Sequence, residues 1–141
     1  MGVMITPYEM VSKVAIPTIR AMISKRLIEN HKLTQEEVAN KLDITQAAVS
    51  YYMMGKRATI LKLDHIKSVR DSTEELADLL FIGDISRKEI RERITEVCDY
   101  LRESKLLCKV HKQLEPDLDI EGCHACDRPL KRRANYTTYI A

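Results

Sequence analysis

Apolar residues recur along this chain mostly at intervals of three and four, which is the spacing of one face of an α-helix. Two such stripes are Ile19, Met22 or Ile23, and Leu27, and, later in the chain, Ile90, Ile94, Val97 and Leu101. No run of Val, Ile and Thr alternates with polar residues as a half-buried strand would, and glycines number only four. The pattern therefore predicts an all-α fold.

Capping motifs indicate where several of the helices begin. In "TPYE" at 6–9, "TQEE" at 34–37 and "SRKE" at 86–89, a hydroxyl residue is followed three positions later by Glu. These motifs and the apolar spacing predict helices over residues 18–30, 34–42, 45–55, 64–81 and 86–104. We expect Pro17 to end or kink the segment that begins at Thr6, because proline lacks an N–H and clashes with the preceding turn.

Residues Gln35 to Met54 fit two short helices joined by a tight turn. The positions that would pack the two helices together are apolar: Val38, Ala39, Leu42, Ile44 and Val49. Ala39 is small, as a close helix crossing requires. The turn falls on Asp43, where a left-handed backbone is needed and where Gly is usual.

The second helix of this pair begins with small polar residues. Gln can pair with adenine through a donor and an acceptor, and Ala or the Thr methyl can contact the thymine methyl. The candidate base contacts are Thr45, Gln46, Ala47 and Ser50. The candidate phosphate contacts are Gln35 and Lys32 on the first helix, and Tyr51, Lys56 and Arg57 on the second. The alternative is a helix pair that binds another protein.

The stretch "LTQEEVANKLDITQAAVSYYMMGKR" resembles the XRE-type, lambda-repressor-like helix-turn-helix regulators. The preceding "IPTIRAMISKRLIENHKLTQ" is similar to an archaeal group of these regulators. The resemblance covers residues 10–57 well and the cysteine-bearing C-terminal segment more loosely. It implies sequence-specific binding of double-stranded DNA by a homodimer. Asp43 departs from the family, which usually has Gly there.

Charge is distributed unevenly along the chain. Residues 1–63 carry nine Lys and Arg against five Asp and Glu, a net charge of +4, whereas residues 64–126 carry ten against fifteen, a net charge of −5. A basic N-terminal half suits a polyanionic partner. The alternative is chance clustering on a solvated surface.

All four cysteines, Cys98, Cys108, Cys123 and Cys126, lie in the last third of the chain. Clustered cysteines in a chain without an export signal favour a metal or redox site over a disulfide framework. All four together would suit an iron–sulfur cluster, most simply a 4Fe-4S cluster. Zinc bound by Cys108, His111, Cys123 and Cys126 is the second interpretation, with Cys98 in the core. Disulfides or free thiols are the third.

The chain shows no phosphate-binding loop, nucleophile elbow or zinc-protease motif, so we do not expect an enzyme or a small-molecule substrate. Apolar runs are too short to span a membrane, and no signal peptide is evident, so we expect a cytoplasmic protein. The predicted domains are a DNA-binding domain over residues 1–60, a helical dimerisation region over 61–107, and a metal-binding loop with a basic tail over 108–141. The predicted function is a transcriptional regulator whose cluster senses redox state or iron.

Overall fold

The computed structural model describes residues 3–127, and within them it contains helices and no strand. The elements are α1 (Pro7–Met10), a π-helical turn (Val11–Ala15), α2 (Ile16–Glu29), α3 (Gln35–Leu42), α4 (Gln46–Met53), α5 (Lys67–Ile82), α6 (Arg87–Glu103) and α7 (Cys108–Leu114). The prediction of an all-α fold is confirmed. The basic tail at 130–141 lies outside the described residues.

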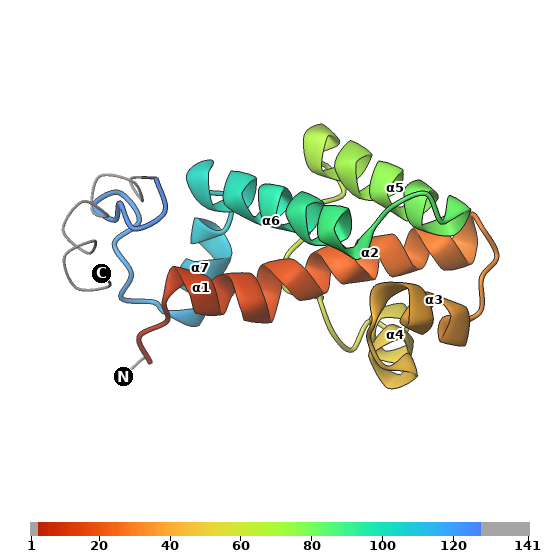
Figure 1. Cartoon of the computed structure of the whole chain (residues 1–141). Helices are drawn as coiled ribbons and strands as arrows, with labels where there is room; N and C mark the ends of the chain where they lie inside the picture. The colour runs from red at the N-terminus through yellow and green to blue at the C-terminus, as the bar shows by residue number, and fades with distance from the viewer. Residues whose placement is uncertain (1–2, 128–141) are drawn as a thin grey trace, which may run out of the picture.

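The first helical segment is continuous from Pro7 to Glu29, so the prediction that Pro17 ends or kinks it is wrong (Figure 1). The residues just before the proline form a π-helical turn, in which the Ile16 N–H donates to the carbonyl of Val11, five residues back. A π turn changes the hydrogen-bond ladder where proline would otherwise clash. The helix therefore passes through Pro17 instead of stopping there.

The π turn also keeps one apolar face along the whole segment. Met10, Val14, Ile19, Ile23 and Leu27 are all buried. Their spacing is four residues, except for a step of five between Val14 and Ile19. A five-residue step would leave the face of an ordinary α-helix, but here it spans the π turn, whose bonds join residues five apart.

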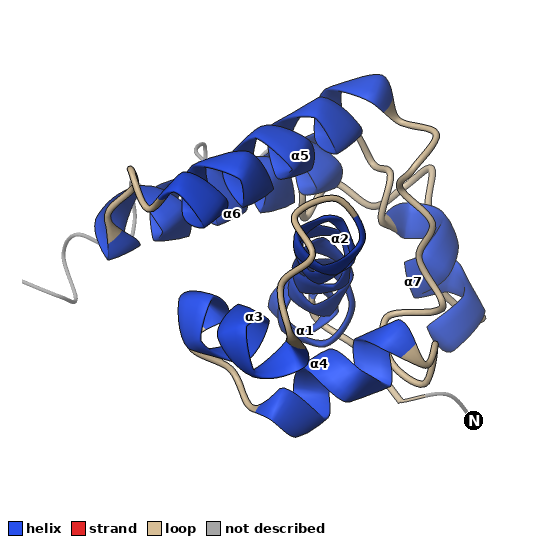
Figure 2. Ribbon diagram, turned by 90° about the vertical axis from the view of Figure 1, so that its right-hand side faces the viewer, coloured by secondary structure: helices blue, strands red, loops and turns tan. Residues whose placement is uncertain are grey.

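The remaining helices pack on two sides of this long segment. Figures 1 and 2 show α3 and α4 on one side of α2, with α5 and α6 on the other. One continuous core joins them, and it includes Leu63, Val69 and Leu101 as well as the α2 face. The α3–α4 pair and the later helices are therefore packed against a shared helix.

The apolar stripes expected to form a dimer interface are used inside the protomer. Val69, Leu76 and Leu80 of α5 are buried, and α5 packs against α2. Leu101 of α6 is also buried, and Ile94 packs against the same core. Sequence spacing identified the buried faces correctly but not the surface that they cover.

Two of the three capping boxes are complete. The Thr6 and Ser86 hydroxyls each accept the backbone N–H three residues on, and a Glu carboxylate accepts the cap N–H in return. At Thr34 the hydroxyl accepts the Glu37 N–H, but the reciprocal bond is not among those of the described residues. Helix α5 begins at Lys67, three residues later than predicted.

Helix α7 was not predicted, because its seven residues are mostly polar and lie where the apolar pattern weakens. It brings the chain back beside its N-terminal residues. The Ile5 N–H donates to the Glu115 carboxylate at 2.8 Å, just after α7 ends. The Arg102 guanidinium of α6 lies over the Tyr8 ring, 4.9 Å from its centroid.

A charged network ties the end of α2 to α5. The Arg26 guanidinium donates two hydrogen bonds to the Asp78 carboxylate, at 2.9 and 3.1 Å, and the His31 ring lies 2.7 Å from the same carboxylate. His31 also stacks on Phe81, with ring centroids 4.1 Å apart. These bonds to Arg26, opposed by partial burial and assisted by His31, hold the pKa of Asp78 below its ordinary value of 3.8.

We expect Asp78→Asn to lower the free energy of unfolding at pH 7 by about 1 kcal/mol, since the network is partly exposed and screened by water. Because the folded-state pKa of Asp78 is depressed, its stabilising effect is present above the unfolded pKa and is lost as pH falls through the folded value. Urea denaturation should therefore show a wild-type advantage at pH 7 that shrinks at pH 3. Asp99→Asn, on exposed α6 surface, is the control. An advantage that does not change with pH would contradict this account.

Candidate nucleic-acid interface

The turn between α3 and α4 has the geometry that the sequence pattern requires. Asp43 adopts a left-handed conformation with φ 54° and ψ 43°. The Ile44 N–H donates back to the Ala39 carbonyl at 3.1 Å. The Asp43 carboxylate lies 2.8 Å from the guanidinium of Arg87, in the first turn of α6. This partner gives an aspartate at the usual glycine position a favourable contact, although a pair so exposed contributes little stability.

The N-terminus of α4 is capped by the side chain expected to face DNA. The Thr45 hydroxyl accepts the Ala48 N–H at 3.1 Å. That bond fixes the start of the helix and leaves the Thr45 methyl as the group free for a base contact. Ala48 and Val49 face the core and are buried.

The opposite face of α4 is open to solvent. Gln46 and Ala47 are exposed, and Tyr51 lies one turn further along the same face with 37% of its surface exposed. Ser50 is half-buried at the edge of this face. Small side chains at the helix start are what allow a helix to approach base edges in a major groove.

Basic side chains follow the exposed face. Lys56 and Arg57 are exposed after the left-handed Gly55, whose φ is 68°. The Arg57 guanidinium lies 4.8 Å from the centroid of the Tyr51 ring, a cation–π arrangement that groups the two side chains.

On the α3 side, Lys32 is exposed and Gln35 is half-buried at the first position of the helix. The predicted DNA contacts on both helices are therefore accessible or partly accessible. Thr45, Gln46, Ala47 and Tyr51 gather on or beside the exposed face of α4.

Arg87 is a residue beside the interface that the sequence did not identify. It lies 44 positions after Asp43, and its side chain reaches the turn from the first position of α6. Lys41 makes a comparable link, with its ammonium donating to the Leu80 carbonyl at 3.0 Å. No local pattern could have revealed either contact.

The four cysteines do not meet at one point. Cys98 is 4% exposed and belongs to the hydrophobic core. Burial raises the pKa of its thiol to about 11, with a smaller contribution from the charge of Asp99. Such a thiol is protonated near neutral pH.

The other three cysteines lie closer to one another. Burial raises the pKa of Cys108, and the nearby charges of Cys126 and Cys123 contribute to the increase. Lys105 holds the loop that carries Cys123 and Cys126. Its ammonium donates to the Cys123 carbonyl at 3.1 Å and lies 3.5 Å from the Asp127 carboxylate.

These side chains do not fit the proposed metal centres as they stand. Within residues 3–127, no three His, Cys, Asp or Glu side chains are grouped so as to hold a metal ion. Cys98 is in the core, so a cluster held by all four cysteines does not match this structure. His111 of the zinc alternative is buried with its Nε2 atom 3.4 Å from Glu115, without the geometry of a hydrogen bond.

Comparison with known families gives one match. Residues 25–64 match the family model described as helix-turn-helix. The chain matches no curated protein and no solved structure. The matched residues contain α3, the Asp43 turn, α4 and the segment that follows, so they form an XRE-type helix-turn-helix DNA-binding domain. Domains of this kind are typical of regulators that are not enzymes. In the part of the chain that the structure describes, every helix is too short or too polar to cross a bilayer.

The burial of Cys98 predicts unequal thiol reactivity. In the folded protein at pH 8 under reducing conditions, Cys108, Cys123 and Cys126 should react with a thiol-specific reagent at least about tenfold faster than Cys98, because the thiolate is the reactive form and Cys98 is shielded. Stopped-flow absorbance with an aromatic disulfide reagent measures the rate and amplitude of each phase of thiol reaction. Unfolding the protein in urea should merge all four thiols into one fast phase. Four equally fast thiols in the folded state would disprove the assignment.

Proposed function

We propose that this chain, whose residues 25–64 form a helix-turn-helix DNA-binding domain, is a sequence-specific transcriptional regulator that places α4 in the major groove. One observation carries the proposal: the exposed face of α4 begins with Gln46 and Ala47 and is followed by Lys56 and Arg57. A face with short side chains and basic residues at its end suits base edges flanked by phosphates.

The residues divide into base contacts and phosphate contacts. In this proposal Gln46 pairs with an adenine, and Ala47 and the Thr45 methyl contact thymine methyls. Lys56, Arg57 and Tyr51 contact phosphates, with Gln35 and Lys32 on the α3 side. The preferred site should therefore contain A·T pairs at the positions beneath the start of α4.

We also propose that the protein acts as a homodimer on two half-sites. A regulator of this type that binds a palindrome matches its own two-fold symmetry to that of DNA, with half-sites about one helical turn apart. The buried α5 and α6 faces cannot supply the interface without opening the core. Among exposed apolar residues, Ile82 and Phe81 at the end of α5 remain available. Sedimentation of the free chain and of its complex with a selected operator gives the stoichiometry of both.

Two substitutions separate sequence recognition from phosphate attraction. Gln46→Ala should reduce the preference for the selected operator over random DNA by about 1–3 kcal/mol while leaving binding to random DNA nearly unchanged. Arg57→Ala should weaken binding to both DNAs and reduce the slope of log affinity against log salt by about one. Fluorescence anisotropy over a range of salt concentrations measures both effects.

Lys109→Ala on α7 is the matched control, because Lys109 is exposed and α7 lies far from α3 and α4 (Figure 1). It should leave the slope and the specificity unchanged. A helix pair that binds protein instead of DNA would show weak, salt-insensitive binding to every DNA tested. That result would overturn the proposed function.

We further propose that the cysteine segment responds to metal supply or redox state, as an iron–sulfur cluster or zinc would allow. The observation that favours a metal is that Cys108 lies near enough to Cys123 and Cys126 for their charges to raise the pKa of its thiol, on a loop that Lys105 bonds through the Cys123 carbonyl. This set leaves Cys98 in the core, as the zinc interpretation expected and the four-cysteine cluster did not.

Metal analysis of protein purified without oxygen tests this second candidate. The full chain should contain iron with sulfide, or zinc, in a constant ratio to protein. Cys123→Ser should lose at least half of that metal, while Cys98→Ser should retain it. Metal-free wild-type protein, or equal loss in both variants, would contradict the proposal.

A further inference from the structure

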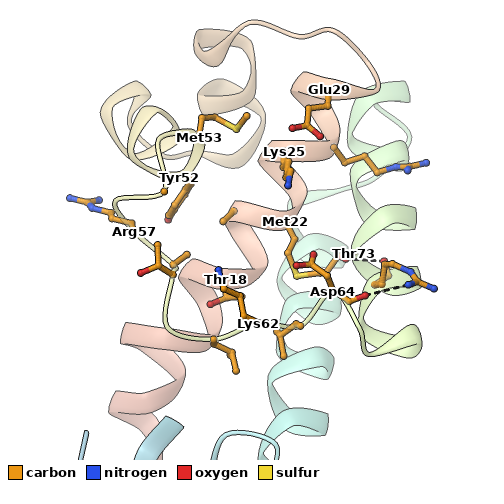
Figure 3. Close-up of a pocket in the computed structure, with 18 of the residues that line it drawn as sticks. Thr18, Met22, Lys25, Glu29, Tyr52, Met53, Arg57, Lys62, Asp64 and Thr73 are labelled. Carbon is orange, nitrogen blue, oxygen red and sulfur yellow. Dashed lines mark hydrogen bonds between the residues drawn. The ribbon is translucent and has the colours of Figure 1, made fainter. Parts of the chain in front are cut away.

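A cavity opens between the helix-turn-helix and the helices behind it. It has a volume of about 510 Å³ and lies between α2, the end of α4, the segment after α4, and α5 (Figure 3). This volume is within the range of small-molecule binding sites, about 300–1,000 Å³. Its walls come from four separate segments, so no local sequence pattern identifies it.

Several charged side chains at the cavity are already engaged elsewhere. Arg26 is bonded to Asp78, and Arg70 donates to the Asp64 carbonyl at 3.3 Å. Arg57 lies against Tyr51, and Figure 3 shows it pointing away from the cavity. These residues form the edge of the cavity, and their charges are largely satisfied or directed outward.

Four charged side chains that line the cavity are not engaged in this way. They are Lys25, Glu29, Lys62 and Asp64, and all four are exposed to solvent. Among the described residues, no ion pair within 4.0 Å includes their side chains. Figure 3 shows a basic and an acidic residue toward each end: Lys25 with Glu29, and Lys62 with Asp64. The cavity therefore offers unpaired charge of both signs to one occupant.

Apolar and aromatic side chains share the cavity wall with these charges. Met22 of α2 and Met53 of α4 are half-buried at the wall, and so is Tyr52. Tyr52 lies on the side of α4 that faces α2 (Figure 3). Methionine and aromatic side chains accommodate apolar groups of varied shape.

We propose that this cavity binds a free amino acid with a large apolar side chain. Its carboxylate would pair with Lys25 or Lys62, its ammonium with Glu29 or Asp64, and its side chain would lie on Met22, Met53 and Tyr52. A simple anion would leave the carboxylates unpaired, and a simple cation would leave the lysines unpaired; a zwitterion satisfies both.

The same cavity touches the segment that carries two proposed DNA contacts. Gly55, Arg57 and Ala58 are among its lining residues, and Gly55 and Ala58 both have left-handed backbones, with φ 68° and 58°. A bound amino acid would contact α2 and this segment together. The site is thus suited to link amino acid supply to the position of Lys56 and Arg57.

Binding is tested on the full chain without DNA, so the outcome does not depend on the proposed function. The twenty amino acids are screened by thermal unfolding, and those that raise the midpoint are titrated by calorimetry. At least one amino acid with a large apolar side chain should bind saturably. Its N-acetyl and its amide derivatives, which remove the ammonium and the carboxylate in turn, should each bind at least about tenfold more weakly.

Protein variants locate the site. Lys25→Met and Asp64→Asn should each weaken binding at least about tenfold, and Lys62→Met provides a second basic variant if Lys25→Met unfolds. Lys109→Met and Asp99→Asn, exposed on α7 and α6, should bind as the wild type does. No binding by any amino acid would overturn the proposal. So would binding that survives all three cavity substitutions, or saturable binding of inorganic phosphate or adenosine monophosphate in place of amino acids.

Discussion

The continuous helical segment from Pro7 to Glu29 is the constraint on which the rest of the structure depends. The helix-turn-helix packs on one side of it, and α5 and α6 pack on the other. It can serve both sides only because its apolar face stays aligned across the π turn, despite the five-residue step from Val14 to Ile19. The DNA-binding domain and the remaining helices therefore share one core. A displacement of α2 would change the packing of α4 and α5 together.

Much of the fold could be predicted from the sequence because its helix starts are set by short-range bonds. The Thr6 and Ser86 capping boxes and the Thr45 cap lie where the pattern placed them. The prediction that Pro17 ends the helix failed because the rule for proline assumes an uninterrupted ladder of α-helical hydrogen bonds. No local sequence pattern predicts the π turn that precedes it. The α6 stripe was expected to be buried, and Leu101 is buried while Ile90, Ile94 and Val97 pack partly buried on the core. An apolar face looks the same whether its partner belongs to the same chain or to another protomer. That choice depends on tertiary packing.

The exposed residues at the start of α4 were predictable for a similar reason: their position follows from the spacing of a short motif. The cysteines were not, because a ligand set depends on long-range geometry. Cys98 lies on the α6 stripe and follows it into the core, whereas Cys108, Cys123 and Cys126 are brought near one another by α7 and by the bonds of Lys105. The cavity behind α4 was equally invisible, since its walls come from α2, the end of α4, the segment after it and α5.

The bond between the Ile5 N–H and Glu115 has a practical consequence for handling the protein. It places the start of the described chain against the cysteine segment, and Met4 lines the same hollow as Cys123. A polyhistidine affinity tag fused next to these residues would therefore lie near Cys123. Its imidazoles bind the same transition metals as cysteine does, so metal retained by such a fusion would report on the tag as much as on the protein.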